Sequence, residues 1–176
     1  MGFVLLEQDV AVLPTELLPA MKRHGRINDD DDDLTIKEKL GQAIDRIQTR
    51  GNFRIVPCKY TWTPSAADFC DGLALVPYPP VRTCTVSGVT DPAAYSVDLR
   101  AIDGVPITYL AGPFAAGMSV EIEAGFVAAA DMPLSLTDAI ERVAAHLYEH
   151  REILIPGSEF VAPDFATDLT WWLPRA

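Results

Sequence analysis

The sequence has few cysteines, and none of them forms the C-x-x-C spacing that is typical of zinc and redox sites. The three cysteines are Cys58, Cys70 and Cys84, so at least one stays unpaired in any disulfide scheme confined to one chain. This favours a reducing compartment. Cys58 and Cys84 fall in predicted strands, where we expect small buried hydrophobic residues rather than reactive thiols.

Basic side chains are also scarce. The 176 residues include 14 Lys and Arg against 25 Asp and Glu, which gives a net charge of −11. Nucleic-acid affinity depends largely on Lys and Arg displacing counterions, so this balance disfavours stable binding of DNA or RNA through a basic face. Five of the acids are consecutive, Asp29 to Asp33, and the rest of the chain carries an ordinary solubility charge.

Long apolar runs are missing as well. The longest uncharged stretch, residues 104–120, is interrupted by Pro106, Gly112 and Pro113, and it would leave backbone groups unsatisfied in lipid. The N-terminus has no basic region ahead of its apolar residues, and Leu6 stands where a myristoylation signal has Ser or Thr. We therefore expect a soluble protein with no membrane partner, made in a cytoplasm.

Common catalytic motifs are absent too. The sequence contains no G-x-S-x-G, no G-x-G-x-x-G, no P-loop and no cysteine matched with a suitable His and Asn. It predicts no catalytic residue, no cofactor and no metal, and we expect that the protein is not an enzyme.

One stretch stands against that expectation. Residues 146–150 read H-x-x-E-H, the spacing of inverted zinc proteases, in which two His bind a metal and the Glu activates water. That motif also needs a third ligand well downstream, and His side chains at a helix C-terminus have a plainer role, because they complement the helix dipole. A zinc-dependent hydrolase that uses His146, Glu149 and His150 is kept as the alternative.

Three segments have the 3.6-residue apolar period of amphipathic helices. They run from about Thr15, a candidate N-cap, to His24, from about Asp33 to Arg50, and from about Ser135, a second candidate cap, to Arg151. The apolar stripe of the second is Ile36, Leu40, Ala43, Ile44 and Ile47, and that of the third is Leu136, Ile140, Val143, Ala144 and Leu147.

The aspartate run stands directly before the second predicted helix. An EF-hand calcium loop starting at Asp29 would need a Gly where Leu34 stands and a Glu where Leu40 stands. We therefore interpret the run as a helix cap within a solvated acidic loop, with a weak cation site as the alternative.

The region between the second and third helices, about residues 53–124, is rich in β-branched and aromatic segments separated by Pro, Gly and Asp. Asp103-Gly104 has the composition of a two-residue hairpin turn. Tyr78-Pro79-Pro80 predicts an extended approach to the strand that begins at Val81. The predicted strands are Phe53 to Trp62, Leu73 to Val76, Val81 to Val86, Tyr95 to Leu99, Ile107 to Leu110 and Ser119 to Ala124. The predicted fold class is α+β, a small bundle of three main helices with an inserted antiparallel β-sheet.

The last segment, residues 152–176, has no periodicity but is rich in aromatic residues. Exposed Trp side chains are costly, and Trp is enriched at binding hot spots, so we expect this segment to dock on a partner. Docking on the chain's own core is the alternative. We thus divide the chain into a domain of residues 1–151 and an extended docking tail of residues 152–176.

The order and spacing of several segments resemble the head-tail connector (adaptor) proteins of long-tailed double-stranded DNA phages and phage-like gene transfer particles. The likeness extends from about Thr15 to Arg175. It is carried by Leu17 to His24 followed by Asp29 to Leu34, by Ala43 to Gln48, by Pro77 to Val81, by Val120 to Phe126 and by Asp131 to Pro133.

This resemblance implies a structural virion protein at the head-tail junction, synthesised in a bacterial host's cytoplasm. The family's proteins form a ring, usually of twelve copies, beneath the portal, through which DNA passes without specific binding. The implied partners are the portal protein, further copies of the chain, and the next neck, stopper or tail protein. Portal docking falls on the tail, where we expect Phe160, Phe165, Leu169, Trp171, Trp172, Leu173 and Arg175 to make the contacts.

Ring closure requires dissimilar surfaces that fit one another, and an inserted sheet with exposed edges provides them, so strand addition between subunits is one mode of assembly. Another neck or tail component, such as a stopper or tail terminator, would also form rings. A monomeric binding module whose tail completes its own core is a further alternative.

Overall fold

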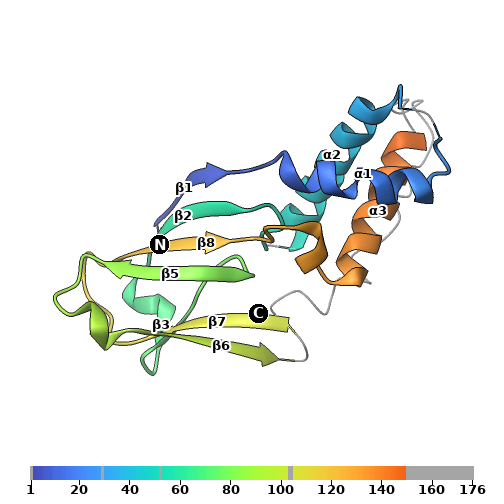
Figure 1. Cartoon of the computed structure of the whole chain (residues 1–176). Coiled ribbons are helices and arrows are strands. Elements are labelled where there is room, and N and C mark those ends of the chain that lie inside the picture. Colours follow the sequence, from blue (N-terminus) through green and yellow to red (C-terminus); the bar gives the residue numbers. More distant parts are fainter. Residues whose placement is uncertain (1, 29, 52, 103–104, 150–176) are drawn as a thin grey trace, which may run out of the picture. The chain divides into compact units, whose positions relative to one another are not determined.

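The computed structural model describes residues 2–28, 30–51, 53–102 and 105–149, whose helices and strands are drawn in Figure 1. The chain divides into two compact units. Among the described residues, the strand unit comprises residues 2–9 and 53–126, and the helix unit comprises residues 10–51 and 127–149. Helices and antiparallel strands are both present, so the predicted α+β class is confirmed. Within the described ranges, no helix has the length and apolar character needed to cross a membrane.

The helix unit contains α1 (Val12–His24), α2 (Asp33–Gly51) and α3 (Leu134–Glu149), the last preceded by a short 3₁₀ turn at Ala129–Asp131. All five predicted stripe residues of α2 are buried, as are four of the five in α3; the fifth, Leu147, is half-buried. Apolar side chains at helical spacing form the core of this unit because each helix buries one stripe against the others.

Both predicted N-caps are wrong. Helix α1 begins at Val12, so Thr15 lies inside the helix, where its hydroxyl donates to the carbonyl oxygen of Ala11 at 2.9 Å. Helix α3 begins at Leu134, and the first backbone N–H groups to find a partner donate to the carbonyl oxygen of Pro133. In both places a proline stands in or just before the first turn, where its missing N–H costs nothing, and this moves the helix start ahead of the polar residue.

The described strands form two four-stranded antiparallel sheets rather than the single inserted sheet that we expected. Sheet A has the order β1-β2-β8-β5, and sheet B has the order β3-β4-β7-β6. The strands of sheet A are β1 (Gly2–Gln8), β2 (Cys58–Thr63), β8 (Ser119–Ala124) and β5 (Val81–Ser87). Those of sheet B are β3 (Phe69–Cys70), β4 (Leu73–Leu75), β7 (Val105–Ala111) and β6 (Ser96–Ile102).

One hydrophobic core joins the two sheets. Alternate residues of β2 and β8 are buried, as expected of strands with one face inward. Tyr60, Trp62 and Ile122 of sheet A belong to the same buried cluster as Leu110 of sheet B. The strand unit is therefore a small β-sandwich.

The first predicted strand is wrong over its first half. Strand β2 begins only at Cys58, and Phe53 and Ile55 are buried without belonging to a strand. The predicted extended approach to Val81 is also wrong at Tyr78, which has a φ of 59°. With this backbone conformation, the Tyr78 ring packs on Phe3 and Tyr60 and lies under the guanidinium of Arg54, 4.6 Å from the ring centre.

The predicted hairpin between β6 and β7 agrees with the pairing of Ile102 with Val105, although the turn residues 103–104 lie outside the described residues. Strand β8 has the predicted bounds. Strand β1 was not expected from the sequence, because its partner β2 begins some fifty residues later along the chain.

Candidate functional site

The residues with the strongest predicted binding role lie outside the described residues. These are Phe160, Phe165, Leu169, Trp171, Trp172, Leu173 and Arg175, all within residues 150–176. Their role in docking remains a prediction.

The H-x-x-E-H stretch lies at the end of α3. His146 is half-buried and Glu149 is exposed, whereas His150 lies outside the described residues. In the part of the chain that the structure describes, no three His, Cys, Asp or Glu side chains are grouped so that they could hold a metal ion.

The aspartate run makes contacts that sequence reasoning missed. The ammonium group of Lys22, in the last turn of α1, lies 2.5 Å from Asp30 Oδ1 and 2.7 Å from Asp33 Oδ1. Hydrogen bonds to Asp30 and then Asp33 raise the pKa of Lys22 to about 12, and the bond to Lys22 lowers the pKa of Asp30. The hydroxyl of Tyr148, on α3, donates to Asp32 Oδ2.

The predicted solvated acidic loop is therefore only partly right. Asp33 begins α2 as expected, and Asp30 is 90% exposed, but the run also connects α1 and α3 to the start of α2. No spacing rule links residues 22, 32 and 148 in the sequence, which is why this contact could not be expected. The run acts as a structural junction of the helix unit.

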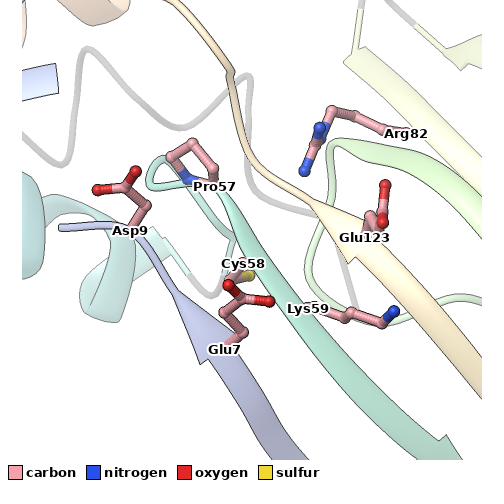
Figure 2. A pocket seen from close by; sticks show the side chains of 7 residues that line it. All are labelled: Glu7, Asp9, Pro57, Cys58, Lys59, Arg82 and Glu123. Carbon is pink, nitrogen blue, oxygen red and sulfur yellow. The ribbon is translucent and has the colours of Figure 1, made fainter. Parts of the chain in front are cut away.

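A second charged region lies on the strand unit, where a hollow of about 210 Å³ opens at one end of sheet A (Figure 2). Its lining comes from β1, β2, β5 and β8 and their ends, namely Glu7, Asp9, Pro57, Cys58, Lys59, Arg82 and Glu123. Acidic and basic side chains face it together, so the hollow suits a partner surface of mixed charge better than a small ion of one sign. Sequence reasoning did not identify these residues because they come from four separate segments.

Lys59 is held on the outer face of sheet A. Its ammonium group lies 2.7 Å from Glu121 Oε1, and the hydrogen bond to Glu121 raises the pKa of Lys59. The thiol of Cys58 is buried, and burial raises its pKa. Cys84, on β5, is half-buried, and desolvation raises its pKa to about 11. The expectation that these two thiols pack as apolar side chains thus agrees with their surroundings.

The outer strands of sheet A are a further candidate surface. Strands β1 and β5 lie at its two edges, and β1 exposes Val4, Leu5 and Leu6, whose side chains are 58%, 44% and 52% accessible. Edge strands present a row of backbone donors and acceptors to which another chain can pair.

The fold is shared with chains of gene transfer agent (GTA) particles, as a comparison with solved structures shows. One match is a chain in the neck of an empty GTA particle computed with C6 symmetry, with a TM-score of 0.68 and 24% identity. Others are chains in the virion of a native GTA particle and in the neck of a native GTA particle computed with C12 symmetry, each with a TM-score of 0.67, at 21% and 22% identity.

Each of these alignments covers 100% of this chain and 97% of the matched chain. Identities at this level show a shared fold, here over the full length. No protein-family model matches the sequence, and a search of curated proteins finds no match.

Proposed function

We propose that this chain is a head-tail connector, or adaptor, that forms a ring beneath the portal vertex and links a DNA-filled capsid to the neck or tail. The observation that carries this proposal is the fold shared with chains of GTA necks and virions over 100% of this chain. The order of sequence segments that resembles the connector family supports the same role independently. On this account the chain is a structural component of a virion and has no catalytic residue.

The ring is supported by two observations. Two of the matching neck structures were computed with C6 and C12 symmetry. This chain also has dissimilar exposed surfaces, such as the two different edge strands of sheet A, and rings require heterologous contacts between unlike patches.

The negative net charge of the chain is compatible with a ring through which DNA passes. A net charge of −11 repels phosphates, so a duplex would slide past such a ring without being held. The proposed partners are therefore proteins: the portal on one side, the next neck protein on the other, and neighbouring copies around the ring.

We assign portal docking to the tail of residues 152–176. Its aromatic and leucine side chains suit insertion into pockets of a partner, because Trp residues contribute most of the energy at many protein interfaces. Arg175 adds a charge-assisted contact at the end of the segment.

The test compares the full chain with a variant that lacks residues 164–176 in co-sedimentation with purified portal rings. We expect the truncated chain to keep its circular dichroism spectrum and lose portal association. Replacing both Trp171 and Trp172 with Ala is expected to weaken binding by about tenfold or more. The matched control, Asp168→Asn with Thr170→Ala, changes polar neighbours in the same segment and should bind as the full chain does. A truncated chain that still binds the portal, or one that no longer folds, would contradict the tail's role.

A further inference from the structure

Sheet A ends on both sides in strands of equal length. Strand β1 (Gly2–Gln8) pairs only with β2, and β5 (Val81–Ser87) pairs only with β8, among the described strands. Each therefore has one edge of backbone N–H and C=O groups that no other described strand covers. The centre of β1 carries three exposed apolar residues and neither proline nor charge, which are the usual means of blocking an edge.

The directions of β1 and β5 allow antiparallel pairing between two copies of the chain. Every neighbouring pair in the order β1-β2-β8-β5 is antiparallel, so β1 and β5 run in opposite directions. If a second copy of the sheet is placed beside the first in the same orientation, its β1 lies antiparallel to β5 of the first copy. The sheet can then continue from copy to copy by a heterologous contact, the type that closes into rings.

The alternation of side chains selects one register. Phe3 and Leu5 pair with the buried residues Trp62 and Tyr60, so their side chains point to the inner face of the sheet, where Leu5 stays 44% exposed because β1 is an edge strand. On β5, Val86 and Cys84 pair with Val120 and Ile122 and point to the same face. Placing Phe3 opposite Val86 also puts Leu5 opposite Cys84, with apolar side chains inward in both strands. Outward-facing Val4 then lies opposite outward-facing Thr85.

The irregularities of the two strands support that register. Strand β1 has a shift between Leu5 and Glu7, and β5 has one between Val81 and Thr83. In the register above, Leu6 lies opposite Thr83 and Glu7 lies opposite Arg82, so both strands bend at the same end. If the pairing of β1 with β5 were shifted by two residues, the irregularities would no longer face each other. Past the irregularity, an inward-facing side chain of one strand would then lie opposite an outward-facing side chain of the other.

The charges at that end are complementary. Glu7 and Arg82 are exposed, and both line the hollow on sheet A (Figure 2). At each junction between copies, Glu7 of one copy would lie opposite Arg82 of the next, and opposite charges on directly facing residues stabilise paired strands.

We propose that β1 of one copy pairs with β5 of the next, in the register that places Glu7 opposite Arg82, so that sheet A is continuous around the assembled ring. This inference rests on the proposed function for the existence of the ring, and it names the surface by which the ring closes. With strands about 4.8 Å apart and four strands per copy, a ring of twelve copies has a circumference of about 230 Å along the sheet.

The test uses disulfide trapping in the full-length chain. Cys70 is exposed and is first replaced by Ser, and the facing positions Val4 and Thr85 are changed to Cys. On mild oxidation we expect a ladder of covalent oligomers up to the closed ring. The matched control carries Val4→Cys with Val97→Cys, an exposed position on β6 of sheet B, and should give no ladder.

A charge exchange gives a second readout. Glu7→Arg and Arg82→Glu, taken singly, are each expected to reduce the assembled fraction in analytical ultracentrifugation by about tenfold, because like charges face each other at the junction. The chain with both changes restores the opposite-charge pair and should assemble as the unchanged chain does.

The outcomes separate this inference from the proposed function. Rings seen by electron microscopy without cross-linking at residues 4 and 85 would overturn the β1–β5 contact and leave the connector role standing. A ladder of open chains without rings would support the contact and contradict the ring. A chain that stays monomeric at every concentration tested, with no cross-linking, would contradict both.

Discussion

Gly125 occupies a position in the strand unit where the backbone conformation and the close packing both require glycine. It directly follows β8, has a φ of 86°, and its N–H donates to the carbonyl oxygen of Pro80 at 3.0 Å. A Cβ atom at this position would lie 2.2 Å from the carbonyl oxygen of Val56, which is far closer than real atoms approach. Only glycine fits here, because both the conformation and the space exclude a side chain.

We predict that Gly125→Ala lowers the free energy of unfolding by about 3 kcal/mol or more, since backbone rather than a flexible side chain would have to move. Gly117→Ala is the matched control. Gly117 has a φ of 81°, but a Cβ atom there would meet nothing within 4 Å, so its substitution should cost only about 1–2 kcal/mol. Urea unfolding followed by circular dichroism measures both, and equal losses in the two variants would show that the close approach to Val56 is not what matters.

At the scale of elements, the acidic run links α1, α2 and α3 through Lys22 and Tyr148. The Lys22 side chain is only 15% exposed, so the ion pairs are partly shielded from solvent. The pKa of Lys22 is raised to about 12 from 10.5, so its contribution to stability is fully present below pH 10.5 and is lost as the pH rises through 12. The pKa of Asp30 is lowered from 3.8, so its contribution is present above pH 3.8 and is lost as the pH falls below that value.

We therefore predict that Lys22→Met lowers the thermal midpoint, by an amount that is constant from about pH 5 to about pH 9 and shrinks on further acidification as Asp30 becomes protonated. Added salt should also reduce the difference, because Asp30 is exposed. Lys37→Met, which removes the same charge from α2, is the control and should have little effect. Thermal melts of the unchanged chain and the two Met variants across pH test this prediction. A difference in thermal midpoint between the unchanged chain and Lys22→Met that stays the same below about pH 3 would show that Lys22 acts through packing alone.

The elements also show what the sequence could predict. The helices were predicted with nearly correct bounds because their apolar spacing is a local property, as the buried stripe from Ile36 to Ile47 illustrates. Strand β1 could not be predicted because its structure depends on pairing with β2, far along the chain. Phe53 and Ile55 have the composition of a strand, yet they are buried outside the described strands, since burial alone does not make a strand.

The candidate sites also divide into those with a local sequence signal and those that depend on long-range pairing. The aromatic tail was identified from composition, which is a local signal, and its docking role stays a prediction. The hollow on sheet A and the facing positions of Glu7 and Arg82 depend on which strands become neighbours, so they became visible only with the sheet order.

Across the full chain, we assign different contacts to different segments. In the proposed function the tail docks on the portal, in the further proposal sheet A pairs with neighbouring copies, and a net charge of −11 repels DNA. The two dissimilar sheet edges and the aromatic tail fit this division, since a ring component needs two unlike surfaces that fit one another and a separate surface for its partner.

The central claim is that this chain occupies the portal vertex. The most direct measurement adds the purified full-length protein to DNA-filled, portal-bearing capsids assembled without it, followed by electron microscopy of the vertices and metal analysis of the same sample. Our account predicts ring-shaped density at the portal vertex alone and no stoichiometric zinc. No vertex binding, together with one zinc ion per chain, would contradict it and would favour a hydrolase based on His146, Glu149 and His150.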